Sequence, residues 1–258
     1  MLRFRSLGSG SSGNATVVEA RSGAQVTRLL IDCGFGLKQL DARLGRAGLR
    51  ASQLDAVFIT HEHGDHIGCA RQLALRERIP VWMSQGTHAA LGPCDFEGLF
   101  NTARDAQAVD IGELRIMPFT VPHDAREPLQ LTCWDGASRL GILTDLGHST
   151  AHVLTHLEHC QALLLECNHD PDLLAASGYP AFLKKRVAGP HGHLANADAA
   201  AIALAVRHAG LHRVVAAHLS ERNNRPELVR SALAAALGRA APEIDVAHAA
   251  EGTPWVDV

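Results

Sequence analysis

The sequence feature that most constrains the fold of this chain is a block of potential metal ligands directly after an apolar run. Residues 57–60 read Val-Phe-Ile-Thr, which predicts a short buried strand. The next residues include His61, His63, Asp65 and His66. In an extended backbone, residues two apart project to the same side, so His61 and His63 can bind one ion together. A turn then directs Asp65 and His66 toward a second position, and these ligand types suit Zn, Mn or Fe.

Three later apolar runs also end in a single potential ligand. In chain order, these ligands are His123, Asp145 and His218. Together with the first block they make seven candidate donors. Seven donors are enough for two ions if one carboxylate bridges them and each ion keeps room for a shared water or hydroxide.

Composition and length set the outer limits of the interpretation. A chain of 258 residues without a long linker is expected to form a single domain over residues 1–258. No apolar run approaches the ~20 residues of a membrane span, and the start lacks the apolar centre of a secretory signal. We therefore expect a cytoplasmic protein with no membrane partner. The six scattered cysteines predict no disulfide, and the net charge of −3 gives no global basic field for nucleic acid.

The order of predicted elements indicates a layered α+β fold. Strands dominate the first part of the chain, and strands alternate with helices after it. Helices are predicted over residues 67–76 and 150–159, and over 197–209 with Asn196 as the cap and Gly210 as the stop. We expect two packed β-sheets flanked by helices, with the site at one edge of the sandwich.

Two further stretches allow both a structural and a functional interpretation. Residues 8–14 (Gly-Ser-Gly-Ser-Ser-Gly-Asn) can form a simple hairpin turn or a set of backbone N–H groups that binds an anion. Lys184, Lys185 and Arg186 form a short basic run that can follow a nucleic-acid backbone or simply face solvent.

With these motifs in view, the sequence resembles the metallo-β-lactamase superfamily, and within it the YycJ/WalJ-like branch. The resemblance covers essentially the whole chain. The matching stretches are residues 7–14, 30–34, 60–66, 141–147, 166–170, 192–196 and 218–224. Two departures are mild, because Cys167 and Ala195 replace residues of the family motifs without changing a candidate ligand.

The resemblance implies an αββα sandwich of two mixed sheets and a definite ligand assignment. His61, His63 and His123 would hold one divalent ion, and Asp65, His66 and His218 the other, with Asp145 as the bridge. The ions would be Zn or Mn, with Fe as a further possibility. An oxygen donor at Asp145 argues against the true β-lactamases, which the resemblance associates with a thiolate at this position.

The predicted function is a dinuclear metal-dependent hydrolase, a phosphodiesterase or 5′-to-3′ exonuclease that acts on DNA through a metal-bridged hydroxide. A cationic dinuclear site suits an anionic diester and its more highly charged transition state. The alternative is a small-molecule metallohydrolase for a cyclic phosphodiester, lactone or thioester, because the same ligands serve many reactions on this fold. A metal-stabilised scaffold without activity ranks third, since none of the seven ligands is missing.

Asp65 and His193 are the predicted catalytic residues, with His193 as the first candidate for general acid or phosphate contact. His148 and His169 are the next candidates for that role. These histidines can instead support ligands or pack, and Asn224 can be a helix cap. The predicted substrate-binding residues are Ser12, Asn14, His148, His169, His193, Ser220 and Asn223. The native metal, DNA against RNA, and the oligomeric state stay open at this point.

Overall fold

The computed structural model describes residues 1–258, and its strands form two seven-stranded sheets. In spatial order, the first sheet contains β14 (Val256–Asp257), β1 (Leu2–Gly8), β2 (Ala15–Ser22), β3 (Gln25–Ile31), β4 (Ala56–Phe58), β5 (Val81–Met83) and β6 (Phe100–Thr102). The second contains β13 (Asp245–Val246), β12 (Arg213–Ala217), β11 (Ala162–Glu166), β10 (Arg139–Leu143), β9 (Leu129–Trp134), β8 (Leu114–Thr120) and β7 (Val109–Ile111). In the first sheet β14, β1, β2 and β3 pair antiparallel and β3 to β6 pair parallel. In the second sheet β7 to β10 pair antiparallel and β10 to β13 pair parallel.

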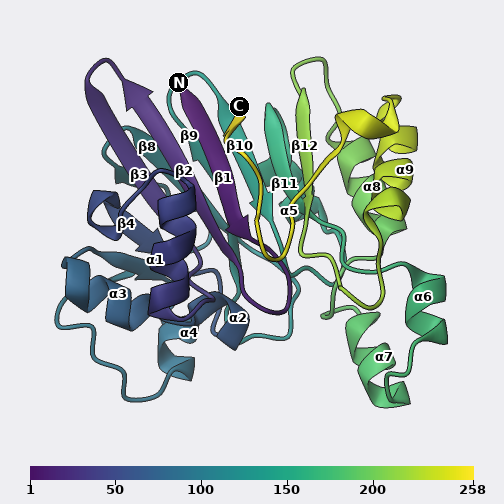
Figure 1. Cartoon of the computed structure of the whole chain (residues 1–258), viewed down its shortest axis with the longest axis horizontal. Coiled ribbons are helices and arrows are strands. Elements are labelled where there is room, and N and C mark those ends of the chain that lie inside the picture. Colours follow the sequence, from purple (N-terminus) through teal and green to yellow (C-terminus); the bar gives the residue numbers. More distant parts are fainter.

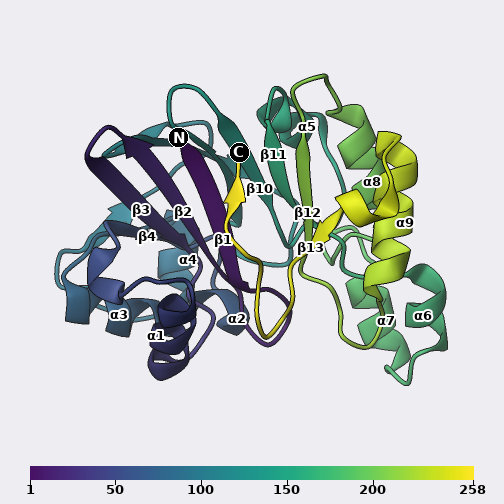
Figure 2. The ribbon, with the colours of Figure 1, turned by 45° about the horizontal axis from the view of Figure 1, so that its top comes forward.

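Helices cover the outer faces of both sheets (Figures 1 and 2). They are α1 (Leu37–Arg46), α2 (Gly64–Ile67), α3 (Ala70–Glu77), α4 (Gln85–Ala90), α5 (Ala151–Leu157), α6 (Pro171–Ala176), α7 (Ala181–Val187), α8 (Asn196–Ala205) and α9 (Pro226–Leu237), with 3-10 turns at Ala51–Gln53 and Ala241–Glu243. None of the helices combines the length and the apolar character needed to cross a bilayer. The predicted arrangement of two mixed sheets flanked by helices is confirmed.

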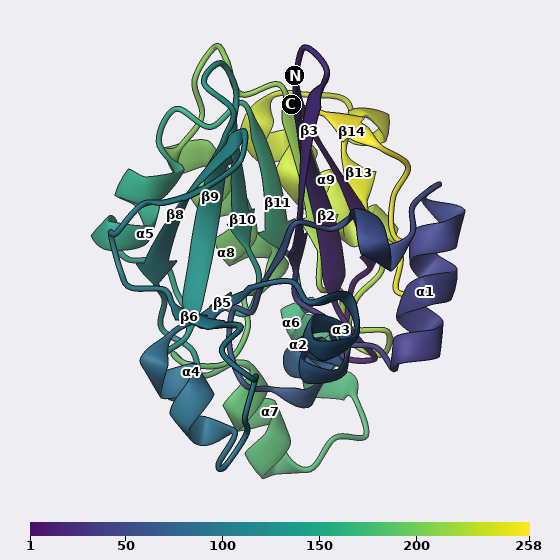
Figure 3. The same cartoon turned by 90° about the vertical axis from the view of Figure 1, so that its left-hand side faces the viewer.

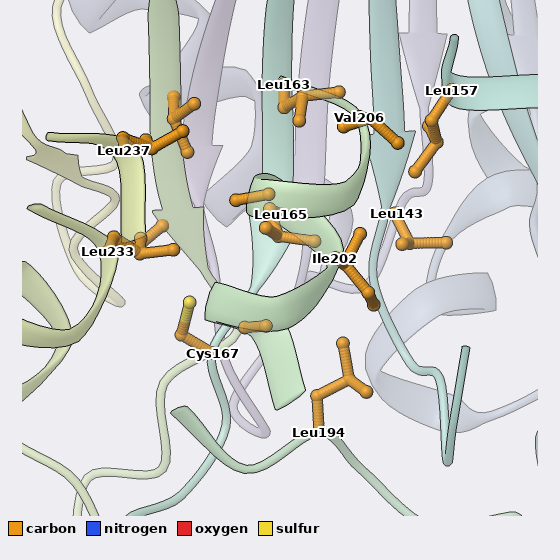
Figure 4. Packing of buried hydrophobic residues seen from close by; sticks show 14 of the residues in the cluster. Leu143, Leu157, Leu163, Leu165, Cys167, Leu194, Ile202, Val206, Leu233 and Leu237 are labelled. Carbon is orange, nitrogen blue, oxygen red and sulfur yellow. The ribbon is translucent and has the colours of Figure 1, made fainter. Parts of the chain in front are cut away.

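Strand β11 shows how the sequence builds these layers. Its side chains alternate between the two faces of the sheet. Leu164 points into the core between the sheets, where it joins Phe4 and Phe58 of the first sheet. Leu163 and Leu165 point outward into the cluster beneath α5, α8 and α9 (Figure 4). A strand buried on both faces is therefore apolar from Ala162 to Leu165, as central parallel strands are, and only its last residue, Glu166, is charged.

The two chain ends meet in the first sheet. Strand β14 pairs with β1 so that Asp257 lies opposite Arg3, and the Val258 N–H donates to the Leu2 carbonyl at 3.0 Å. Both ends lie at the top of Figures 1 and 3, whereas α2 and α7 lie at the bottom. The ligand block of α2 is thus at the end of the sandwich away from the termini.

Several predicted helix boundaries are wrong. The helix expected over residues 67–76 is two helices, because Gly68 adopts a φ of 31° between them. Helix α8 ends at Ala205 instead of continuing to Gly210. Beyond it, the chain is drawn away from the helical path by the His208 Nε2 contact with the Cys160 carbonyl (2.9 Å) and by burial of Leu211.

The prediction that Asn196 caps α8 is also wrong. Asn196 lies inside the first turn of the helix, and no side chain makes a capping hydrogen bond there. Its side chain pairs reciprocally with that of Asn224, at 2.9 and 2.8 Å. Asn224 also donates to the Cys167 carbonyl at 2.7 Å, so it is not the cap of α9 either. Both side-chain amides are buried, and their mutual hydrogen bonds satisfy polar groups that have little access to water.

Candidate metal centre

The seven candidate ligands come from the ends of four strands and meet at one end of the sandwich. His61 and His63 follow β4, and Asp65 and His66 lie in the short helix α2. His123, Asp145 and His218 follow β8, β10 and β12. Since β4 belongs to one sheet and the other three strands to the second, the cluster spans the junction between the two sheets. Each of the seven belongs to a group whose ligand atoms lie within 4.8 Å of one another.

Three histidine nitrogens form the first group. His63 Nδ1 lies 3.1 Å from His61 Nε2 and 3.3 Å from His123 Nε2. The rings meet edge to face, which directs the nitrogens toward a shared point. This is the arrangement of three imidazole ligands around one ion.

The second group contains Asp65, His66 and His218. Asp65 Oδ2 lies 3.7 Å from His66 Nε2 and 3.5 Å from His218 Nε2. Asp145 lies between the groups, with Oδ2 at 2.8 Å from His66 Nε2 and Oδ1 at 3.9 Å from His123 Nε2. The Asp145 carboxylate therefore faces both groups.

Each of the five histidines has an oxygen partner behind it. The contacts run from His61 Nδ1 to Thr60 Oγ1 (3.0 Å), His63 Nε2 to the Asp124 carbonyl (3.2 Å), His66 Nδ1 to Asp32 Oδ2 (2.7 Å), His123 Nδ1 to the Gly192 carbonyl (3.1 Å) and His218 Nδ1 to Glu166 Oε1 (3.2 Å). In the neutral imidazole the proton stands on that nitrogen, so the other presents a lone pair to the cluster. Such partners fix the tautomer of metal-binding histidines.

The nitrogen and oxygen donors of the cluster are better placed to bind divalent cations than to hydrogen-bond to one another. Asp145 Oδ2 and His218 Nε2 are buried without a hydrogen-bond partner. When His66 is neutral, with its proton toward Asp32, its Nε2 lone pair faces the Asp145 carboxylate, 2.8 Å away. Lone pairs facing one another at this distance repel, and a cation among them removes the repulsion. The chemistry of the donor set thus matches two nitrogen- and oxygen-liganded metal ions.

The carboxylates and imidazoles of the metal-free cluster also shift one another's acidity. Burial opposes ionisation of Asp145, but the charges of His218 and His66 outweigh it and hold the pKa of Asp145 well below its usual value. Burial likewise opposes the charge on His218, yet Asp145, Asp65 and Glu166 raise its pKa to about 10. Protons on these imidazoles balance the carboxylates, and a metal ion has to displace them.

Backbone conformation contributes to the geometry of the cluster. Asp145 and His218 adopt positive φ angles of 56° and 54°, and Asp32 behind His66 has 60°. This left-handed conformation costs a non-glycine residue about 1 kcal/mol or more. It turns the side chain sharply at the end of the strand, toward the cluster. Strand patterns do not reveal these angles, so they could not be predicted from the sequence.

The glycine- and serine-rich loop contacts the segment that carries Asp65 and His66. The loop connects β1 to β2, and Asn14 at its end is buried. Asn14 Nδ2 donates to the Asp65 carbonyl at 3.2 Å and lies 3.1 Å from His66 Nε2. Gly34 packs against the same segment so closely that a Cβ would lie 1.7 Å from the Asp65 carbonyl oxygen. The loop positions Asp65 and His66 through Asn14.

A cavity of about 380 Å³ opens over the cluster. Among the predicted residues, Asp65, Asp145, His193 and His218 line it, together with His63. Ser12 and Ser220 line a neighbouring cavity of about 320 Å³, and Ser11 and Tyr179 border both. His148, His169 and Asn223 line neither, and the last two are buried.

Sequence reasoning did not single out several residues that the structure places here. Glu166, at the end of β11, is buried and its Oε1 lies 2.7 Å from His193 Nδ1 and 3.2 Å from His218 Nδ1. Its Oε2 accepts from the Leu146 N–H at 2.8 Å. Asp124, Tyr179, Leu183 and Val187 also line the cavity, together with Arg186 of the predicted basic run. A carboxylate at the end of a buried strand was the sequence signal for Glu166. The positions of Tyr179, Leu183 and Val187 depend on where α7 and the turn before it lie, and the sequence did not indicate this.

Comparison with known proteins agrees with this geometry. The β-lactamase superfamily domain matches residues 27–219. Exodeoxyribonuclease YycJ of Bacillus anthracis is 30% identical over 92% of this chain and 89% of its own, and exodeoxyribonuclease WalJ of Streptococcus pneumoniae (strain D39) is 28% identical with the same coverage. The metallo-β-lactamase fold protein YhfI of Bacillus subtilis superimposes with a TM-score of 0.74 at 17% identity, covering 99% of this chain and 98% of YhfI. The chain therefore belongs to the β-lactamase superfamily and is a metal-dependent hydrolase with the metallo-β-lactamase fold.

Proposed function

We propose that this protein is a dinuclear phosphodiesterase that degrades DNA as a 5′-to-3′ exonuclease. The convergence of seven nitrogen and oxygen donors beneath one cavity carries the proposal. The similarity to two proteins named exodeoxyribonucleases, over nine-tenths of the chain, supports the choice of substrate. Because the ligands come from both sheets, we also propose that residues 1–258 act as one domain. We also propose that the protein acts in the cytoplasm, where DNA would be available to it.

We assign His61, His63 and His123 to one metal ion and Asp65, His66 and His218 to the other, with Asp145 between them. Zn or Mn fits these donors, and Fe is compatible with them. Divalent cations, when bound there, lower the pKa of water toward about 7 and offset the charge of a phosphodiester. The carboxylates of Asp65 and Asp145 neutralise only part of the cationic charge, so the loaded site attracts an anionic diester.

The chain's own residues supply positioning and proton transfer. Glu166 holds His193 Nδ1 at 2.7 Å, which leaves Nε2 of this half-exposed ring available to the cavity. His193 is therefore placed to give a proton to the leaving oxygen of a cleaved diester. Asp65 lies at the edge of the cavity with a side chain 25% exposed, where it can accept a proton from the attacking water.

The size of the cavity also favours a second candidate, hydrolysis of a small phosphodiester. A volume of about 380 Å³ is at the low end of the range for small-ligand sites. It can hold one nucleotide at the end of a strand or a complete small diester. The two candidates share the metal centre and differ in what lies outside the cavity.

A single set of assays tests the proposal. The protein is stripped with a chelator and reloaded with Zn, Mn or Fe. Turnover is then measured on bis-p-nitrophenyl phosphate and on single- and double-stranded DNA carrying a 5′ or a 3′ label. We expect metal-dependent release of the 5′ label as a mononucleotide, while the 3′-labelled strand shortens progressively. Cleavage of the small diester without cleavage of DNA would favour the second candidate, and inactivity with every metal would refute both.

A further inference from the structure

We propose that α7 and the turn before it, residues 179–187, form an aromatic and basic surface that binds the unpaired bases of single-stranded DNA entering the cavity. This inference rests on the proposed function and specifies how its substrate is held. We name residues 179–187 the cavity rim.

The rim is built unlike the other α-helices of the chain, each of which has at least one buried residue. No residue of α7 is buried, and the helix projects at the end of the sandwich where α2 lies (Figures 1 and 3). Phe182 is 74% exposed, more than any other large apolar residue of the chain. The ring adds nothing to the core, so the stability of the fold does not explain an aromatic side chain at this position.

Phe182 lies beside the residues that form the cavity wall. Tyr179, Leu183 and Arg186 line the cavity, and Tyr179 also borders the neighbouring one. Residues four apart on a helix are neighbours, so Phe182 stands next to Arg186. The rim thus presents two aromatic rings at the opening, one within the wall and one just outside it.

The charge of this segment is opposite to that of the whole chain. Residues 173–197 contain Lys184, Lys185 and Arg186 and no Asp or Glu, although the chain carries a net charge of −3. Lys184 Nζ donates to the Ala175 carbonyl at 2.5 Å, and Arg186 Nε donates to Asp124 Oδ2 at 2.6 Å, which ties α7 to the segment beside His123. Lys185 is exposed and makes no such contact, so its ammonium group is available to a phosphate.

Exposed aromatic rings beside basic side chains match single-stranded nucleic acid. Bases stack on aromatic rings whatever their identity, and lysine or arginine follows the phosphates. In a duplex the bases already stack on one another and offer no free face. A strand whose terminal nucleotide fills the cavity would therefore leave its next bases on the rim. The surface selects the single-stranded end of DNA.

The test compares Phe182→Ala, Phe182→Trp and Lys185→Gln with Leu204→Ala, a control at an exposed apolar residue of α8 (49% exposed). Turnover is measured on single-stranded DNA and on bis-p-nitrophenyl phosphate, and the ratio of the two is compared between variants. Binding of a fluorescent oligothymidylate is measured by anisotropy in the His193→Ala background, where cleavage does not interfere.

We expect Phe182→Ala to weaken DNA binding and to lower the DNA-to-diester ratio about tenfold, as loss of one stacked base does. Phe182→Trp should restore both, Lys185→Gln should make binding less sensitive to salt, and Leu204→Ala should behave as wild type. An unchanged ratio, or equal loss on both substrates, would overturn the inference. So would a wild-type dimer that Phe182→Ala converts to monomers, since a second copy would then cover the rim. DNA binding that depends on the rim, without DNA cleavage, would refute the proposed exonuclease activity and would leave the proposed binding surface supported.

Discussion

The seven candidate ligands beneath the cavity, which we call the floor, and the rim are constructed in opposite ways. On the floor, His66, Asp145 and His218 are almost fully buried, and each imidazole is held from behind by an oxygen partner. On the rim, no residue of α7 is buried and Phe182 is 74% exposed. Buried imidazoles that are each held by an oxygen partner keep the ligand geometry fixed, whereas an exposed helix can change sequence without disturbing the core. We therefore assign the proposed chemistry to the floor and the proposed choice of substrate to the rim.

The largest effect is expected from removing the Asp145 carboxylate, which lies between the two groups of candidate ligands. Asp145→Asn removes the charge that faces both ligand groups, so we expect activity on bis-p-nitrophenyl phosphate to fall by roughly 10⁴-fold, about the loss of a central catalytic group. Bound metal, measured by elemental analysis, should fall with it. Asp110→Asn is the matched control, because that carboxylate is exposed and pairs only with Arg115. Normal activity in Asp145→Asn would remove this residue from the metal centre.

Removing the proposed proton donor, His193, should separate catalysis from metal binding. His193→Ala should keep its metal and lose about 10²- to 10⁴-fold in kcat, the usual contribution of a general acid. Glu166→Gln should give a smaller loss and change the pH dependence of kcat, because it keeps the hydrogen bond to His193 and removes the charge. Metal loss in His193→Ala would indicate a ligand role, and unchanged turnover would exclude the residue from the mechanism.

The contacts behind the floor should tune affinity for metal. Asp32 Oδ2 lies 2.7 Å from His66 Nδ1 and Asp32 also accepts from the Thr60 backbone N–H. Asp32→Asn should weaken metal affinity by about 10- to 100-fold, the usual effect of changing such a partner. Competition with a fluorescent chelator measures this, with Asp41→Asn on the surface as control. Equal affinities in both variants would show that the partner does not matter.

A buried carboxylate away from the cavity provides a reference for the floor. Burial opposes ionisation of Glu19, but hydrogen bonds from Arg21, Arg28 and Arg3 outweigh it and lower its pKa. A pKa lowered by folding stabilises the protein above the unfolded value near pH 4.3, and that stabilisation is lost as the pH falls through the folded value.

Wild type should therefore lose more stability than Glu19→Gln between pH 7 and the acid range, because only wild type loses the stabilisation from this carboxylate as it is protonated. Urea unfolding of the metal-free proteins at both pH values measures the difference. Parallel stability profiles would show that the Glu19 charge does not contribute.

The floor was largely predictable from the sequence and the rim was not. His61, His63, Asp65 and His66 lie within one short segment, and strand patterns delivered the remaining ligands to strand ends. The apolar run of residues 162–165 leaves few alternatives to the strand β11 that forms there.

Elements with few buried residues gave no comparable pattern. Helix α7 has no apolar stripe, so only its basic run was visible in the sequence. The pairing of Asn196 with Asn224 and the positive φ of Asp145 depend on contacts distant in the sequence, and no local pattern encodes them.

The pairing of β14 with β1 has a practical consequence for handling the protein. Since Val258 hydrogen-bonds to Leu2 and both chain ends lie at the end away from the cavity, an affinity tag on either terminus should leave substrate access open. A short peptide could also join the two ends, and the chain could then be opened at the Gly23 turn between β2 and β3. Such a circular permutant would keep both ligand groups intact.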